Sequence, residues 1–227
     1  MTNKLFIAGV VLLFLLGMGW LVYYLSIPLP GVKMPELGRD HITDIAEITY
    51  NSNPPTSGSH FPLWAKPGLY PEVISDGYLI HSLEHGYVVI SYNCDKKFAI
   101  FNFQLVKNVF AHDDDPLTEA SDSGKLLMHM TAVMKGDESW ITPNNLPPTE
   151  IELPSEFASD SCKKLVEELR PFLNVKPRVI IVPRPSLDAR IAMTAWNRVE
   201  TMDAVDSEKI TTFIKAHHNN GPEQTME

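Results

Sequence analysis

The sequence predicts an α+β domain, built on a mixed and mainly antiparallel sheet with packed helices and preceded by one N-terminal transmembrane helix. Three observations lead to this fold class. An uncharged apolar run of bilayer length lies near the N-terminus, several later stretches alternate in polarity as strands do, and others repeat apolar residues with helical spacing. About 200 residues follow the apolar run, which is enough for one domain with a full core.

The apolar run covers Leu5–Ile27 and contains no charged residue. About 20 such residues span a bilayer as a helix. Trp20, Tyr23 and Tyr24 lie at its distal end, where interfacial aromatic residues are enriched. No small-x-small cleavage site follows the run, so we interpret it as an uncleaved anchor. Lys4 on the short N-terminal side favours a cytoplasmic N-terminus and a domain on the extracytoplasmic side of the cell membrane.

These features predict the organisation of the whole chain. We expect a cytoplasmic tail and transmembrane anchor at 1–28, a linker at 29–43, one globular extracytoplasmic domain at 44–223 and a tail at 224–227. The membrane bilayer is then a partner of residues 5–27. Association with another membrane protein, or with a second copy of the chain, stays open at this point.

Four stretches of the predicted domain have the β-branched, aromatic and alternating character of strands. In the first of these, Tyr87, Val89 and Ser91 would point to one side of the sheet. The predicted strands are Tyr87–Asn93, Ala99–Leu105, Arg178–Pro183 and Arg190–Asn197.

Helices are predicted near 125–135, 161–170 and 207–218. The second has Cys162, Leu165, Val166 and Leu169 at the i, i+3, i+4, i+7 spacing of one helical face. The third follows Asp206, a residue type that caps helix N-termini.

The charge of the chain argues against a nucleic-acid partner. The formal net charge is −9, and the basic residues are scattered. Binding to a phosphate backbone requires clustered Lys and Arg, so we expect no nucleic acid among the partners. The two cysteines, Cys94 and Cys162, form no CxxC motif. We expect them to be paired if the domain is exported to an oxidising compartment.

The candidate site lies at His81-Ser82-Leu83-Glu84-His85-Gly86, which we expect to form a short turn leading into the strand at Tyr87. Residues four apart share one side of a helical turn, so His81 and His85 can offer imidazoles to one metal ion. Glu84 is then a ligand, a base or an acceptor that orients a ligand. His60 lies in a proline-stiffened loop, and we expect it to meet the other two histidines in space. His41, in the linker, is expected to be solvated.

The motifs PPTSGSH, HSLEHGYVVISY, MTAWN and GPE together resemble a bacterial and archaeal domain family of unknown function. The resemblance covers roughly Tyr50–Glu223, and the stretch Lys135–Phe157 stands as an insertion in it. Members are typically membrane-anchored and extracytoplasmic. The resemblance implies that the important positions are His60, His81, Glu84 and His85, and it implies no established activity.

Residues 81–85 also match H-x-x-E-H, the motif of inverzincin zinc proteases. In that class the two histidines bind zinc and the glutamate activates water, so Glu84 would be catalytic. The motif must then lie within a helix, whereas a strand is predicted directly after Gly86. Whether the protein is an enzyme therefore stays undecided by the sequence.

Three functions remain. The first is a membrane-anchored, extracytoplasmic metal-binding protein with His60, His81 and His85 as ligands and Glu84 or Met193 as a fourth. Three imidazoles suit zinc or copper, and a methionine would favour copper. The second is a zinc hydrolase with Glu84 as base. The third is an interaction module without a metal, in which the histidines are structural.

The topology can be tested directly. A cysteine placed at Gly31 should react with a membrane-impermeant thiol reagent in intact cells, because the predicted orientation puts this position outside. Labelling that appears only after lysis would reverse the orientation.

Overall fold

A computed structural model describes residues 2–43, 48–95, 140–141 and 151–223. The chain divides into two units, Met1–Pro30 and Gly31–Glu227. The first unit is dominated by helix α1 (Thr2–Leu25). Within it, Phe6–Leu25 has a mean hydropathy of 2.3 and is long and apolar enough to cross a membrane. By length and composition this helix is a candidate membrane anchor, and a signal sequence would have the same properties.

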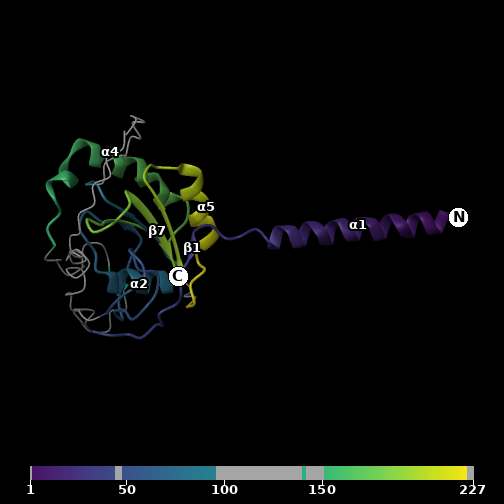
Figure 1. The fold of residues 1–227 in the computed structure, drawn as a ribbon, viewed down its shortest axis with the longest axis horizontal. Coiled ribbons are helices and arrows are strands. Elements are labelled where there is room, and N and C mark those ends of the chain that lie inside the picture. The colour runs from purple at the N-terminus through teal and green to yellow at the C-terminus, as the bar shows by residue number, and fades with distance from the viewer. Residues whose placement is uncertain (1, 44–47, 96–139, 142–150, 224–227) are drawn as a thin grey trace, which may run out of the picture. The chain divides into compact units, whose positions relative to one another are not determined.

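A six-stranded mixed sheet organises the described part of the second unit (Figure 1). Its strand order is β1-β8-β7-β4-β6-β3. The β1–β8, β8–β7 and β7–β4 pairs are antiparallel, and the β4–β6 and β6–β3 pairs are parallel. Together with the helices, this confirms the predicted α+β class. The strands are β1 (Val32–Lys33), β3 (Gly68–Leu69), β4 (Val88–Tyr92), β6 (Val179–Pro183), β7 (Ile191–Ala195) and β8 (Arg198–Met202).

Three of the predicted strands are present within one or two residues at each end, as β4, β6 and β7. The prediction missed β8, which pairs with β7 directly after Asn197, a turn residue with a φ of 57°. A short parallel pair, β2 (Trp64–Ala65) with β5 (Trp140–Ile141), was also not predicted. The strand predicted at Ala99–Leu105 and the helix predicted near 125–135 lie outside the described residues.

The helices predicted near 161–170 and 207–218 are confirmed as α4 (Asp160–Leu169) and α5 (Ser207–His217). The side chain of Asp206 caps α5 by accepting a hydrogen bond from the Lys209 N–H. Two 3-10 turns flank α4, one at each end. They are η2 (Ser155–Ala158) and η3 (Arg170–Asn174).

The histidine-containing stretch is a helix, α2 (Asp76–Glu84), rather than the short turn predicted from the sequence. Ser75 caps it by accepting from the Gly77 N–H, and Asp76 follows in the first turn. All nine residues of α2 are buried. A helix that is covered on every side has no amphipathic pattern, so its sequence carries no helical period from which it could be predicted.

Side chains alternate across the sheet and form two apolar clusters. On one face, Val89 and Ile180 pack with Phe61 and Tyr78, so α2 and the loop before it cover this side. On the other face Val88 and Ile181 pack beneath α4 and α5, and this second cluster also contains Cys162, Met193 and Phe213. The sheet is therefore the middle layer, with α2 on one side and α4 and α5 on the other (Figure 1).

A disulfide bond joins Cys94, just beyond the end of β4, to Cys162 in the first turns of α4. The two Cα atoms are 5.4 Å apart, which is within the usual range for a disulfide. This confirms the predicted pairing of the two cysteines. The bond ties the central strand to a helix on the second face of the sheet.

A buried ion pair fixes the N-terminus of α2 to the segment after β6. Arg184 Nη1 donates to Asp76 Oδ1 at 2.6 Å, and Nη2 donates to Oδ2 at 2.9 Å. Both residues are 5% exposed. The Nε–H of the same guanidinium donates to Asn53 Oδ1 at 2.8 Å, and the two opposite charges of the pair compensate each other.

Removal of one partner from this pair should destabilise the domain strongly. Arg184→Met leaves the Asp76 carboxylate buried without its counter-charge, and we expect a loss of about 3–5 kcal/mol in the free energy of unfolding. Urea denaturation of the full chain in detergent measures it. The matched control is Arg170→Met, which breaks the exposed pair with Glu167 and should change stability only marginally. Equal effects of the two substitutions would contradict the role assigned to Arg184.

Candidate metal centre

Helix α2 presents two of the predicted site residues on neighbouring positions of its surface. His81 and Glu84 are three residues apart, a spacing that brings side chains together on one side of a helix. His85 is the C-cap residue, and Gly86 ends the helix with a φ of 77°. A Cβ at Gly86 would lie 2.6 Å from the Cα of Asn219, so glycine is also required by the packing.

The loop that precedes this helix, which contains Pro54, Pro55 and His60, runs alongside the helix and is hydrogen-bonded to it at more than one position. Phe61 N–H donates to the Gly77 carbonyl oxygen at 3.1 Å. Four residues on, Ala65 N–H donates to Ser82 Oγ at 3.1 Å, and that hydroxyl donates back to the Ala65 carbonyl at 2.9 Å. These bonds place His60, which precedes Phe61, opposite the side chains of α2.

Two main-chain carbonyl groups of the loop fix the orientation of the buried imidazoles. His60 Nδ1 lies 2.8 Å from the Gly58 oxygen, and His81 Nδ1 lies 2.7 Å from the Phe61 oxygen. A carbonyl oxygen only accepts, so each Nδ1 must carry the proton. In the neutral ring the lone pair is then on Nε2, which is the arrangement found in metal-binding histidines whose other nitrogen is held by a carbonyl.

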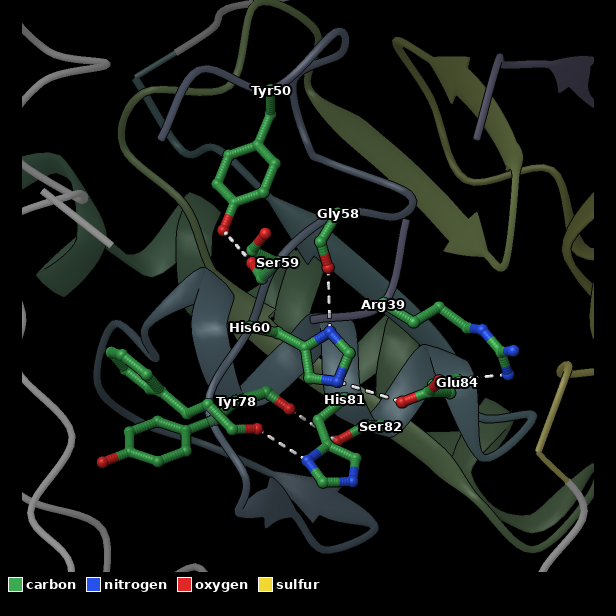
Figure 2. Close-up of polar contacts among 10 residues, drawn as sticks. Arg39, Tyr50, Gly58, Ser59, His60, Tyr78, His81, Ser82 and Glu84 are labelled. Atoms are coloured by element: carbon green, nitrogen blue, oxygen red, sulfur yellow. Dashed lines mark hydrogen bonds and ion pairs between the residues drawn. The ribbon is translucent and has the colours of Figure 1, made fainter. Parts of the chain in front are cut away.

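Glu84 lies between the His60 ring and the guanidinium of Arg39 (Figure 2). His60 Nε2 is 2.9 Å from Glu84 Oε2, and Arg39 Nη1 is 3.5 Å from Glu84 Oε1. Both His60 Nε2 and Glu84 Oε2 are buried, and neither makes a well-aligned hydrogen bond within the described part of the chain. With Nδ1 holding the ring proton, two electron pairs face each other here, and a shared cation or an additional proton relieves the repulsion.

A fourth side chain completes the group. One ligand atom from each of His41, His60, His81 and Glu84 can be chosen so that all lie within 4.8 Å of one another. The His41 ring lies 4.9 Å from the His81 ring and 5.0 Å from the His60 ring, between centroids. His41 is exposed and the other three are buried.

The group is close to the dimensions of a four-coordinate site. Bonds of about 2.0–2.1 Å in a tetrahedron separate the ligand atoms by roughly 3.3 Å. The His60–Glu84 pair, at 2.9 Å, is already this close. All the ligand atoms lie within 4.8 Å of one another, so each separation exceeds the tetrahedral value by at most roughly 1.5 Å.

The local electrostatics keep the donors in their binding forms. Burial lowers the pKa of His81 to about 3, against the opposing hydrogen bond to Phe61, and the nearby histidines lower it further. His81 is therefore neutral at physiological pH. Burial alone would raise the pKa of Glu84, but contact with His60 and the neighbouring His81 and Arg39 outweigh it, and the pKa is lowered. Glu84 is a carboxylate.

The structure brings His60, His81 and Glu84 together. The other two predicted residues, His85 and Met193, lie outside the group of converging ligand atoms. The His85 ring stacks on His81, with centroids 4.7 Å apart, and contacts Trp64, but it is not part of the group of converging ligand atoms. Met193 packs in the cluster on the opposite face of the sheet, beneath α4 and α5, and does not join the site. Met193 is therefore not positioned to donate its sulfur atom to this group.

Sequence reasoning missed His41. We expected it to be solvated, and it is exposed, but it also lies against the cluster. Its position depends on main-chain pairing, in which the His60 N–H donates to the Asp40 oxygen at 3.0 Å and the Ile42 N–H donates to the His60 oxygen at 2.8 Å. Such pairing leaves no side-chain pattern in the sequence.

The C-terminal GPE motif supports the end of α2. The Glu223 N–H donates to the Glu84 carbonyl oxygen at 3.1 Å, and the Asn219 N–H donates to the Gly86 oxygen at 2.8 Å. A Cβ at Gly221 would fall on the Glu84 carbonyl group, so only glycine fits there. This contact holds the main chain of Glu84 in place from a segment more than a hundred residues away.

Comparison with known families identifies one relationship. The model of a family described as "Protein of unknown function (DUF3105)" matches residues 41–115 and 156–227, which is more than half of the chain. His41 is the first residue of this match, and all the converging ligands lie within it. No curated protein and no solved structure matches the chain.

The buried neutral state of His81 predicts how stability depends on pH. The folded pKa of about 3 lies below the unfolded value of 6.5. Between these values the unfolded chain binds the extra proton, so stability is complete above about pH 6.5 and falls as the solution is acidified towards pH 3. This group contributes at most about 1.4 kcal/mol per pH unit. Urea denaturation of the metal-free protein at a series of pH values measures the slope, and His81→Phe should reduce it. An unchanged slope in that variant would contradict the assignment.

Proposed function

We propose that this chain, which belongs to the DUF3105 family of proteins of unknown function, binds a divalent transition-metal ion through His41, His60, His81 and Glu84. One observation carries the proposal. Main-chain carbonyl groups hold the Nδ1 atoms of His60 and His81, so both Nε2 lone pairs are directed away from them, and His60 Nε2 meets a buried carboxylate oxygen at 2.9 Å. A cation is the partner that satisfies all three donors together.

The donor set favours a zinc or copper(II) ion. Imidazoles suit both metals, and the carboxylate adds a hard oxygen ligand. Copper(I) prefers soft sulfur ligands, and Met193, the sulfur ligand considered from the sequence, lies on the other face of the sheet. Between the two divalent ions we favour zinc, because three nitrogen and one oxygen ligands in a tetrahedron are typical of it.

Binding is better supported than hydrolysis. Catalytic zinc sites keep one position open for water, whereas four side chains converge here. The protease reading also requires His81 and His85 as the ligand pair with Glu84 as a base. Here Glu84 is among the converging donors and His85 is not. A zinc hydrolase therefore remains the second candidate, favoured only by the match of residues 81–85 to its motif and by their position on and next to helix α2.

The cellular location proposed for this site is the outer face of the cell membrane. The apolar helix α1 supplies an anchor of sufficient length. The Cys94–Cys162 disulfide supports export, because such bonds persist in oxidising compartments and are rare in the cytosol. Lys4 ahead of the apolar run favours the same orientation.

Metal content tests the proposal. The untagged full chain, purified in detergent and dialysed against buffer containing excess Zn²⁺ and then metal-free buffer, should retain about one zinc ion per chain by elemental analysis. His60→Ala and His81→Ala should each lower the affinity roughly tenfold or more, and acidification should release the ion as the imidazoles protonate.

The matched control is His85→Phe, which keeps a ring against Trp64 but removes the nitrogen atoms. This variant should retain zinc as the unsubstituted chain does. Loss of zinc in His85→Phe would favour the protease ligand set instead. Absence of zinc, and of copper in a parallel experiment, from the unsubstituted chain would leave the interaction module as the better description.

A further inference from the structure

The four converging side chains come from two parts of the chain that differ in how firmly they are held. His60, His81 and Glu84 are almost completely buried, at 0%, 3% and 3% exposure. They lie on α2 and on the loop that is hydrogen-bonded along it. His41 is exposed and belongs to Leu37–Ile42, the stretch we call the bridging segment.

The bridging segment is attached mainly through its backbone. The Gly58 N–H donates to the Gly38 oxygen at 3.2 Å, and the two bonds to the main chain of His60 are the only others between backbones that involve its described residues. Leu37 N–H adds a bond to Ser57 Oγ at 3.1 Å. Such bonds contribute little each, because water replaces them when the segment detaches.

Apolar packing adds little more. Leu37, Gly38, Arg39, Asp40 and His41 are all exposed, and Ile42 alone is half-buried against the core. Arg39 contacts Glu84 at 3.5 Å, but its side chain is 49% exposed. An ion pair of that kind is screened by solvent and holds a segment weakly.

A bond between His41 and a bound ion would therefore be the strongest single attachment of the bridging segment. The residues just before the segment have attachments of their own. The Met34 N–H donates to the Asn197 oxygen at 3.0 Å, and Asn51 Nδ2 donates to the Pro35 oxygen at 2.7 Å. The segment can then leave the site locally without detaching the chain that precedes it.

We propose that His41 is the exchangeable ligand of the site, and that the bridging segment controls how quickly the ion enters and leaves. This inference rests on the proposed function. The buried trio binds the ion first, with one coordination position towards solvent. Docking of the bridging segment then places His41 in that position and closes the shell. Release follows the reverse order, because His41 is the ligand that solvent and a competing chelator reach first.

Zinc release from the full chain in detergent tests this inference. The zinc-loaded protein is mixed rapidly with an excess of a colorimetric chelator, and the rate of zinc transfer is recorded. His41→Ala should still bind one zinc ion per chain but should release it roughly tenfold faster or more, because the open position is never closed. The matched control is Thr43→Ala, an exposed substitution next to the bridging segment, which should leave the release rate unchanged.

Hydrogen–deuterium exchange supplies a second measurement on the same protein. Zinc should slow the exchange of peptides covering 37–42 in the unsubstituted chain, and this protection should be absent in His41→Ala.

The possible outcomes separate the two proposals. Equal release rates for His41→Ala and the unsubstituted chain, or no zinc-dependent protection of 37–42, would overturn this inference while leaving zinc binding in place. Complete loss of zinc from His41→Ala would also overturn it, because His41 would then be needed to form the site. Absence of zinc from the unsubstituted chain would overturn the proposed function and this inference together.

Discussion

The hydrogen bonds from His60 and His81 to main-chain carbonyl groups are the constraint on which the site depends. Each bond fixes the ring's tautomer and its rotation at the same time, so the lone pair of Nε2 points where the fold requires. Both carbonyl groups belong to one loop, and that loop is positioned by its bonds to α2. The packing of a single loop on a single helix therefore decides both the position and the protonation state of two donors.

Helix geometry explains why the H-x-x-E-H sequence does not determine the ligand set by itself. Successive residues turn by about 100°, so Glu84 lies roughly 60° to one side of His81 and His85 roughly 40° to the other. Either one can share a site with His81. The partners supplied by the rest of the fold make the choice. His60 and Arg39 contact Glu84, whereas Trp64 packs against His85. The loop that covers the helix, and not the motif alone, therefore decides which residue lies beside His81.

The sequence predicted an element correctly where the pattern of its residue types follows directly from the way the element packs. Strands β4 and β6 alternate between two apolar faces, so their positions could be read from residue types. Helix α2 could not, because it is buried all round and its polar residues face partners inside the protein. The proximity of His60 to His81 was predicted, since both lie in distinctive motifs. The side of the sheet on which Met193 lies could not be predicted, because a strand pattern shows that side chains alternate between two faces but does not show which face lies against α2.

The disulfide has a consequence for how the chain tolerates change in length. Cys94 and Cys162 are separated by 68 positions in sequence and 5.4 Å in space. The covalent bond pins both ends of the intervening stretch to β4 and α4, whatever that stretch contains. Lengthening a closed loop costs only about 0.6 kcal/mol per doubling, and here the sheet and its covering helix are joined independently of it. A reporter domain inserted between the two cysteines would therefore leave the covalent link between β4 and α4 intact.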